Sequence, residues 1–261
     1  MIITLLQYIL SVISGIAVGF SLGLIGGGGS ILAIPLLLYF VGIDDPHVVI
    51  GTTALAVGLN AYINSISHWR RHNINFKVGI IFSAMGVIGV LIGTTLGLIT
   101  KGDLLLFIFS FLMMGIGIYI FMTKCRKASA DSGGKVNEMG KPTKVSVFGV
   151  IAGFASGFFG IGGGFLIVPS ILYSSNLNIN RAVGTSLIAV GTFGIVTAIR
   201  YGIAGQLLIP ISILYVLGGF FGGIVGSKIS AGMDRTLLRR IFAVIIIVVG
   251  IYMAIQNISA I

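Results

Sequence analysis

Long apolar stretches separated by short polar gaps dominate the chain. The stretches cover residues 2–25, 29–43, 48–67, 78–100, 103–123, 145–161, 164–175, 182–200, 207–227 and 236–258. Crossing a membrane takes about 20 apolar residues in an α-helix. The stretch at 164–175 is shorter, so the second stretch of each half is either a short tilted helix or one arm of a re-entrant hairpin. The pattern predicts an all-α polytopic membrane protein with about six to ten membrane segments.

A glycine-rich motif occurs twice, once in each half of the chain. The first copy spans residues 15–39 and contains Gly26-Gly27-Gly28-Gly29-Ser30, followed by Pro35. The second copy spans residues 149–173 and contains Gly160-Ile161-Gly162-Gly163-Gly164, followed by Pro169. Interrupted apolar segments in corresponding halves indicate the binding site of a secondary transporter.

Further motifs repeat in the same order. Gly51-Thr52-Thr53 corresponds to Gly184-Thr185-Ser186, and Gly117-Ile118-Tyr119 corresponds to Gly250-Ile251-Tyr252. We call the spacing from Gly51 to Gly184 the repeat spacing. The glycine-rich motifs are one position further apart, which a single deletion near 40–50 explains. We therefore divide the chain into a first membrane repeat at 1–123, a cytoplasmic linker at 124–144 and a second membrane repeat at 145–261.

Composition and charge agree with a membrane location. Only 8% of the residues are charged, against about 25% in soluble domains, so we expect a multi-pass protein of the cell (inner) membrane. The net charge of +10 comes from basic residues in the polar gaps, as the positive-inside rule requires, and does not indicate a nucleic-acid partner. With the linker in the cytoplasm, the basic gap at 68–77 is also cytoplasmic and the acidic turn at 44–46 is outside. This tracing predicts two repeats of inverted topology.

The glycine runs disfavour regular helix, because glycine costs about 1 kcal/mol relative to alanine at each position. Irregular backbone at membrane depth must be buried in protein, so we expect turns there. Helices beginning at Ser30 and Phe165 would then point free N–H groups and partial positive charge at an anion in a shared central cavity. The alternative is that the glycines only permit close helix crossing.

Polar side chains accompany these motifs. Thr52, Thr53, Thr185 and Ser186 begin the third element of each half, where a hydroxyl either caps the helix or donates to a substrate oxygen. Asn60 and Asn64 share one helix face and bond either a neighbouring helix or the substrate. The predicted substrate-binding residues are Gly26, Gly27, Gly28, Gly29, Ser30, Thr52, Thr53, Asn60, Asn64, Gly160, Gly162, Gly163, Gly164, Thr185 and Ser186.

Several kinds of chemistry find no support in the sequence. Acidic and basic residues are absent from the middle of every apolar stretch, although intramembrane carboxylates usually carry proton coupling in pumps. Neither a catalytic constellation nor the Gly-x-x-x-x-Gly-Lys-Ser/Thr motif of ATP-driven proteins occurs. The single cysteine, Cys125, excludes an internal disulfide. We therefore expect no enzyme activity, no cofactor and no metal site.

Taken together, the paired glycine runs, the prolines that follow them, and the Gly-Thr-Thr and Gly-Thr-Ser segments resemble the sulfite exporter TauE/SafE family. The resemblance covers nearly the whole chain and implies a bacterial or archaeal permease for sulfite, sulfonates or other small anions. One departure is Ile161, which interrupts the second glycine run, so the two half-sites need not contribute equally.

The leading prediction is a secondary transporter of a small anion, such as sulfite or an organosulfonate, that works by alternating access. The alternatives are an anion channel and a membrane scaffold protein without transport activity. The expected partners are membrane lipid and the small anionic substrate. A coupling ion and a homodimer are left open, as are the identity of the anion and the direction of transport.

Overall fold

The structure, a computed structural model, describes residues 4–25, 27–122, 141–160, 162–230 and 235–258. These ranges are almost entirely helical and contain no strand. The long helices are α1 (Leu5–Ile25), α3 (Pro46–Arg70), α4 (Phe76–Ile99), α5 (Gly102–Met122), α6 (Pro142–Phe159), α8 (Ile179–Ile203), α9 (Ile209–Ser230) and α10 (Arg235–Gln256). The shorter elements are η1 (Gly27–Leu32), α2 (Ala33–Pro35), η2 (Leu36–Phe40) and α7 (Gly164–Ser174).

Every predicted apolar stretch coincides with a helix, or, at 29–43, with a run of short helical elements. Among the described residues, seven helices are long and apolar enough to cross a membrane. Three shorter apolar helices cover 29–40, 164–174 and 240–256. The prediction of an all-α polytopic membrane protein is confirmed.

Polar residues in the gaps fix where three of the long helices begin. Asp45 precedes α3, Asn75 precedes α4 and Asn178 precedes α8. The side-chain oxygen of each accepts a hydrogen bond from a main-chain N–H of the first turn, at 2.9, 3.2 and 3.0 Å respectively. Such caps satisfy donors that a helix leaves free at its N-terminus. They explain why these helices start at the edges of the apolar stretches.

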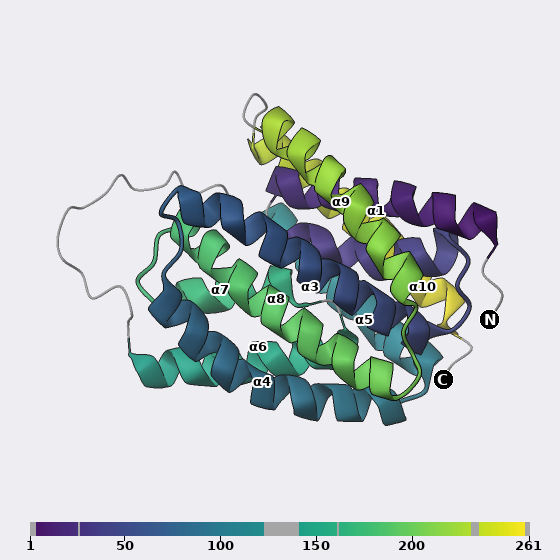
Figure 1. Ribbon diagram of the computed structural model, residues 1–261, viewed down its shortest axis with the longest axis horizontal. Helices are drawn as coiled ribbons and strands as arrows, with labels where there is room; N and C mark the ends of the chain where they lie inside the picture. Colours follow the sequence, from purple (N-terminus) through teal and green to yellow (C-terminus); the bar gives the residue numbers. More distant parts are fainter. Residues whose placement is uncertain (1–3, 26, 123–140, 161, 231–234, 259–261) are drawn as a thin grey trace.

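Each long helix packs mainly against a helix from the other half of the chain. The pairs are α1 with α9, α4 with α6, α3 with α8, and α5 with α10. In the internal repeat, α1 corresponds to α6 and α4 corresponds to α9, so the α1–α9 and α4–α6 pairs are equivalent. Likewise α3 corresponds to α8 and α5 to α10, so each of these two pairs joins a helix to its own counterpart. The two halves are therefore interleaved, and the long helices run roughly along the longest dimension of the molecule (Figure 1).

Glycines allow two of these pairs to cross with main chains in contact. A Cβ on Gly19 of α1 would lie 2.6 Å from the Cα of Gly219 on α9. A Cβ on Gly153 of α6 would lie 2.9 Å from the Cα of Gly86 on α4. No side chain larger than hydrogen fits such a gap. Gly153 and Gly86 are the counterparts of Gly19 and Gly219, so the two pairs cross at equivalent points.

Loops that the charge pattern assigns to opposite sides lie at opposite ends of the molecule. At one end, a Cβ on Gly102 would lie 2.8 Å from the Cγ of Pro46, and the Asn257 amide donates to the Tyr39 hydroxyl at 2.9 Å. At the other end, the Asn73 carbonyl contacts Gly184. Figure 1 shows that α1 begins and α10 ends at the same end of the molecule. The acidic turn and the basic gap are therefore separated by the length of α3.

Candidate functional site

The second glycine-rich run breaks the helical path, as expected. Gly160, Gly162 and Gly163 have φ angles of +67°, +66° and +66°, a left-handed conformation that glycine adopts without the steric cost of a Cβ. Ile161 lies outside the described residues. As a result α6 ends at Phe159 and α7 begins at Gly164.

This glycine turn, residues 160–163, lies at mid-depth in the molecule. A Cβ on Gly162 would lie 3.1 Å from the Cγ1 of Val57 and 3.2 Å from the Cγ1 of Val190. Val57 and Val190 are each next to the midpoint of their helix, α3 and α8 respectively. The first glycine-rich segment, η1, also contacts α7. The first glycine-rich segment therefore packs against the helix that follows the glycine turn.

The first glycine-rich run differs from the second. Gly27–Leu32 forms a 3-10 helix, and the short α2 and the π-helical η2 follow directly. The helix expected to begin at Ser30 is therefore a run of short helical elements that begins at Gly27. A Cβ on Gly29 would lie 2.6 Å from the carbonyl carbon of Ser21, so this segment packs on the main chain of α1, and the narrow 3-10 helix suits that close contact. Gly26 lies outside the described residues.

At the glycine turn, an uncapped helix N-terminus adjoins a buried hydroxyl. Gly163 is the N-cap of α7, and as glycine it has no side chain to accept a hydrogen bond from the first turn. The Oγ of Ser156, on α6, lies 3.2 Å from the position of a Cβ on Gly163. Ser156 is 1% exposed and its hydroxyl has no hydrogen-bond partner among the described residues. Helix N-termini attract anions, and the hydroxyl supplies a further donor.

Sequence reasoning missed Ser156. The sequence feature that could have pointed to Ser156 is its position one helical turn before Gly160, which places its side chain on the side of α6 next to the glycine turn. The equivalent position in the first half is Leu22, so the motif common to the two halves did not point to it.

Thr52 and Thr185 connect the two halves of the protein. The Leu208 N–H donates to the Thr52 hydroxyl at 3.1 Å, and the Asn75 N–H donates to the Thr185 hydroxyl at 2.9 Å. Leu208 and Asn75 are themselves related by the repeat spacing, so the two bonds are equivalent. Each ties the third helix of one half to the start of the fourth helix of the other. Neither threonine caps its own helix.

The two threonines lie at different levels of the bundle. Helices α3 and α8 are antiparallel, because Gly51 contacts Tyr201 whereas Gly184 contacts His68. Thr185 is therefore level with a residue roughly 15 positions after Thr52 on α3, which corresponds to about 22 Å. One small anion cannot contact both threonines at once. The expectation of a single site that contains both hydroxyl pairs is therefore corrected.

The neighbouring hydroxyls of Thr53 and Ser186 are satisfied within their own helices. Thr53 donates to the carbonyl oxygens of Val49 and Ile50 at 2.8 and 3.0 Å. Ser186 donates to the carbonyl oxygen of Val183 at 2.8 Å. Both residues are fully buried. Substrate binding by the four hydroxyl residues stays a prediction.

Asn60 and Asn64 share one face of α3, as their spacing predicted. The Asn64 side-chain amide donates to the Asn60 carbonyl at 2.9 Å. The Asn60 side chain packs on α9, where its Cγ lies 3.1 Å from the position of a Cβ on Gly219. Asn60 is 2% exposed, and its Oδ1 has no hydrogen-bond partner among the described residues. This oxygen accepts hydrogen bonds, so it is available to a ligand that carries a donor.

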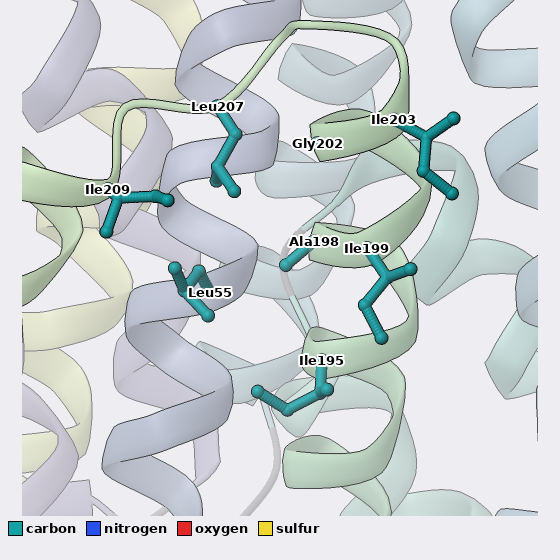
Figure 2. A pocket seen from close by; sticks show the side chains of 8 residues that line it. All are labelled: Leu55, Ile195, Ala198, Ile199, Gly202, Ile203, Leu207 and Ile209. Carbon is teal, nitrogen blue, oxygen red and sulfur yellow. The ribbon is translucent and has the colours of Figure 1, made fainter.

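An open groove between α3 and the end of α8 has an entirely apolar lining (Figure 2). The lining residues are Leu55, Ile195, Ala198, Ile199, Gly202, Ile203, Leu207 and Ile209. Ile199 and Ile203 are also strongly exposed, as expected of side chains that face lipid. The side chains that line the groove offer no hydrogen-bond donor. Near this end of α8, the guanidinium of Arg200 donates to the Thr95 hydroxyl at 3.0 Å.

The bundle exposes large apolar side chains over most of its long helices and buries threonine, serine and asparagine between them. That distribution, with seven helices long enough to span a bilayer, defines a multi-pass membrane protein. The model of the sulfite exporter TauE/SafE family matches residues 11–253. The chain belongs to this family.

Curated relatives match the chain over almost its whole length. A "Probable membrane transporter protein" of Xylella fastidiosa (strain 9a5c) is 40% identical over 252 residues, which is 95% of each chain. The "Probable membrane transporter protein YdhB" of Bacillus subtilis (strain 168) is 27% identical and covers 92% of this chain and 94% of its own. A "Probable membrane transporter protein" from Haemophilus influenzae is 28% identical over 94% of this chain and 97% of its own. No solved structure matches.

Proposed function

We propose that the protein is a secondary transporter of the cell membrane that moves a small anion, such as sulfite or an organosulfonate, by alternating access. The observation that carries the proposal is the glycine turn at mid-depth. It places the uncapped N-terminus of α7 and the unpaired hydroxyl of Ser156 between the central helices α3 and α8. The names of the relatives support transport, and the family name supports a sulfur oxoanion.

The chemistry of this site suits an anion that must also be released. A buried anion needs several hydrogen bonds to offset its desolvation. The N-terminus of α7 supplies main-chain N–H groups and a partial positive charge, and Ser156 supplies a hydroxyl. Because these donors carry no full charge, they hold the anion less strongly than a buried arginine or lysine would. Moderate binding favours release on the other side of the membrane.

Alternating access requires that the two repeats pack against each other in two different arrangements. The interleaved packing of the repeats supports this proposal, because every long helix of one repeat contacts a helix of the other. We propose that the two repeats have inverted topology, with the basic gap at 68–77 on the cytoplasmic side. The antiparallel α3–α8 pair lies at the centre, and the α1–α9 and α6–α4 pairs occupy corresponding places in the two halves. In such folds, rocking of one repeat against the other opens the site alternately to the two sides.

The proposal is tested by flux measurements on the purified protein in proteoliposomes, with radiolabelled sulfite, sulfate and methanesulfonate. A transporter gives saturable uptake, and unlabelled anion trapped inside accelerates the entry of labelled anion by counterflow. An anion channel gives flux without counterflow. A scaffold protein gives no flux above protein-free vesicles. Either of the last two results refutes the proposed mechanism.

Two glycine variants test the position of the site. Gly162 and Gly205 have φ angles of +66° and +73°, so Gly162→Ala and Gly205→Ala carry the same backbone cost of about 1–2 kcal/mol. Nothing lies within 4 Å of a Cβ on Gly205, whereas a Cβ on Gly162 contacts Val57 and Val190. We expect Gly162→Ala to lower the flux strongly and Gly205→Ala to preserve it. Equal flux in the two variants would place the site elsewhere.

A further inference from the structure

At one buried location, the two equivalent halves carry different chemistry. At the repeat spacing, Asn60 corresponds to Phe193 and Tyr215 corresponds to Phe82. We call Phe82 and Phe193 the aromatic pair, and Asn60 and Tyr215 the polar pair. The aromatic pair joins α4 to α8, and the polar pair lies on α9 and α3, the counterparts of α4 and α8.

The aromatic pair is a well-packed apolar contact. The rings of Phe82 and Phe193 stack with their centroids 6.2 Å apart. Both residues are fully buried, and the Phe193 ring lies directly on Gly86 of α4. The fold therefore accommodates two aromatic rings at these positions without any polar atom.

The polar pair has the same framework. The Asn60 amide lies on Gly219, just as Phe193 lies on Gly86, and Tyr215 precedes Gly219 by one turn, as Phe82 precedes Gly86. Asn60 is 2% exposed and Tyr215 is 0% exposed. Neither the Asn60 Oδ1 nor the Tyr215 hydroxyl has a hydrogen-bond partner among the described residues.

A third difference lies close by on α1. Ser14 directly precedes Gly15 of the first glycine-rich motif, and Phe148 occupies the corresponding place before the second motif. Ser14 is 1% exposed, and its hydroxyl also has no partner within the described ranges. A Cβ on the adjacent Gly15 would lie 3.0 Å from the Cα of Tyr215. Three polar residues thus occupy positions that hold phenylalanine in the other half.

Packing alone does not account for the polar pair. Burying a polar atom without a partner is unfavourable, and most buried polar atoms in native proteins are paired. The aromatic pair shows that apolar side chains fill the same framework. A ligand that binds at the polar pair supplies the missing partners.

The location fits the substrate. Asn60 is one turn from Val57 on the same face of α3, and Val57 contacts the glycine turn. The Tyr215 hydroxyl can donate a hydrogen bond to an oxygen atom, whereas the Asn60 Oδ1 can only accept one. Resting on the proposed transport function, we propose that the Tyr215 hydroxyl donates to an oxygen atom of the transported oxoanion and that the Asn60 Oδ1 accepts from a protonated oxygen of the same ion. The aromatic pair binds no oxygen atom, so the protein holds its substrate on one side of its two-fold arrangement.

The test is Tyr215→Phe, which removes one oxygen atom, together with Asn60→Phe, which copies the residue of the other half. Both are measured in proteoliposomes with whichever of sulfite, sulfate or methanesulfonate the native protein transports. Loss of one hydrogen bond to a charged ligand predicts a rise in KM of about tenfold to a hundredfold. The thermal unfolding temperature without anion should stay the same or rise in Tyr215→Phe, because an unpaired buried hydroxyl is removed.

Tyr201→Phe is the matched control. The Tyr201 hydroxyl is equally buried and also lacks a partner among the described residues, but it lies near the end of α8. We expect its KM to be native. The stabilisation of the purified protein by added anion should likewise persist in Tyr201→Phe and disappear in Tyr215→Phe.

The KM values and the stabilisation by anion decide whether the polar pair binds the substrate. Native KM and native anion stabilisation in both polar-pair variants overturn the inference, and so does an equal loss in Tyr201→Phe. If the native protein carries no anion of the panel, the inference falls together with the proposed function. Flux by the native protein with unchanged KM in the variants overturns the inference alone.

Discussion

Thr52 offers a sharp test of how the two halves are joined. Thr52→Val keeps the β-branched shape but removes the acceptor for the Leu208 N–H, which it meets at 3.1 Å. Leaving a buried donor unpaired costs about 1–3 kcal/mol. Because this bond is only partly buried, we expect a loss of about 1–2 kcal/mol in the free energy of unfolding.

Thr53→Val is the matched control at the next position of the same helix. Thr53 is as fully buried as Thr52, but its hydroxyl only donates to carbonyl oxygens of its own helix. Those carbonyls keep their helical hydrogen bonds after the change, so no group is left without a partner. We expect a change within about 0.5 kcal/mol.

The assay is thermal unfolding of detergent-solubilised protein followed by size-exclusion chromatography. A loss of about 1–2 kcal/mol corresponds to a fall of roughly 2–8 °C in the unfolding temperature. The unfolding temperature of Thr185→Val should fall by a similar amount, because the Thr185 hydroxyl accepts the equivalent hydrogen bond from the Asn75 N–H. A native unfolding temperature in Thr52→Val, or an equal fall in Thr53→Val, would refute the role of this bond. A raised KM in Thr52→Val without loss of stability would instead support substrate binding by Thr52.

Two further outcomes follow from the proposed site and topology. Ser156→Ala should raise the KM for the transported anion by about tenfold, because one donor to the charged ligand is lost. The control Ser174→Ala should leave the KM unchanged, because the Ser174 hydroxyl donates to a carbonyl of its own helix. Equal KM values in the two variants would remove Ser156 from the site. In a Cys125→Ser background, a cysteine at Ala204 should react with a membrane-impermeant maleimide added to intact cells, whereas one at Asn73 should not; the reverse pattern would overturn the orientation.

Local rules in the sequence account for most of the helix positions. Apolar runs of about 20 residues must become helices in a membrane, because lipid offers the backbone no other partners. Asp45, Asn75 and Asn178 mark three helix starts, since side-chain caps depend only on neighbours in the sequence. The break at Gly160–Gly163 was also predictable, because a dense glycine run removes the preference for helix.

The first glycine run shows where local rules fail. Gly27–Gly29 has the same composition as Gly162–Gly164, yet it coils into a 3-10 helix. Glycine permits both conformations, so the surrounding contacts decide between them. At Gly29 the deciding contact is the main chain of α1, which a glycine count does not reveal. Ile161 is a visible difference between the two runs, but its effect on the backbone depends on packing.

The four hydroxyl residues show a related limit of reasoning from the sequence. Their place at the start of equivalent helices suggested a shared site, but antiparallel packing of α3 and α8 puts those starts at opposite levels. The acceptor role of Thr52 toward Leu208 depends on the pairing of helices that lie in different halves of the chain, for which a single sequence holds no signal. Inverted topology by itself, once predicted, already implied the separation. Equivalent residues of antiparallel helices lie at the same level only near the midpoints of those helices, as Val57 and Val190 do on either side of Gly162.

The difference between Asn60 and Phe193 has a separate explanation. Both residues lie two positions from the midpoint of their helices, but Asn60 packs on α9 and Phe193 packs on α4. The two positions therefore form separate environments, and the proposed ligand occupies one of them. Asn60 and Phe193 sit on equivalent glycines in separate environments, and only the first has an unpaired polar atom. Aligning the two halves of the sequence places Asn60, Tyr215 and Ser14 opposite phenylalanine, but it does the same for Ser174 and Arg240. Only the structure shows that the first three are buried and have a polar atom without a partner among the described residues.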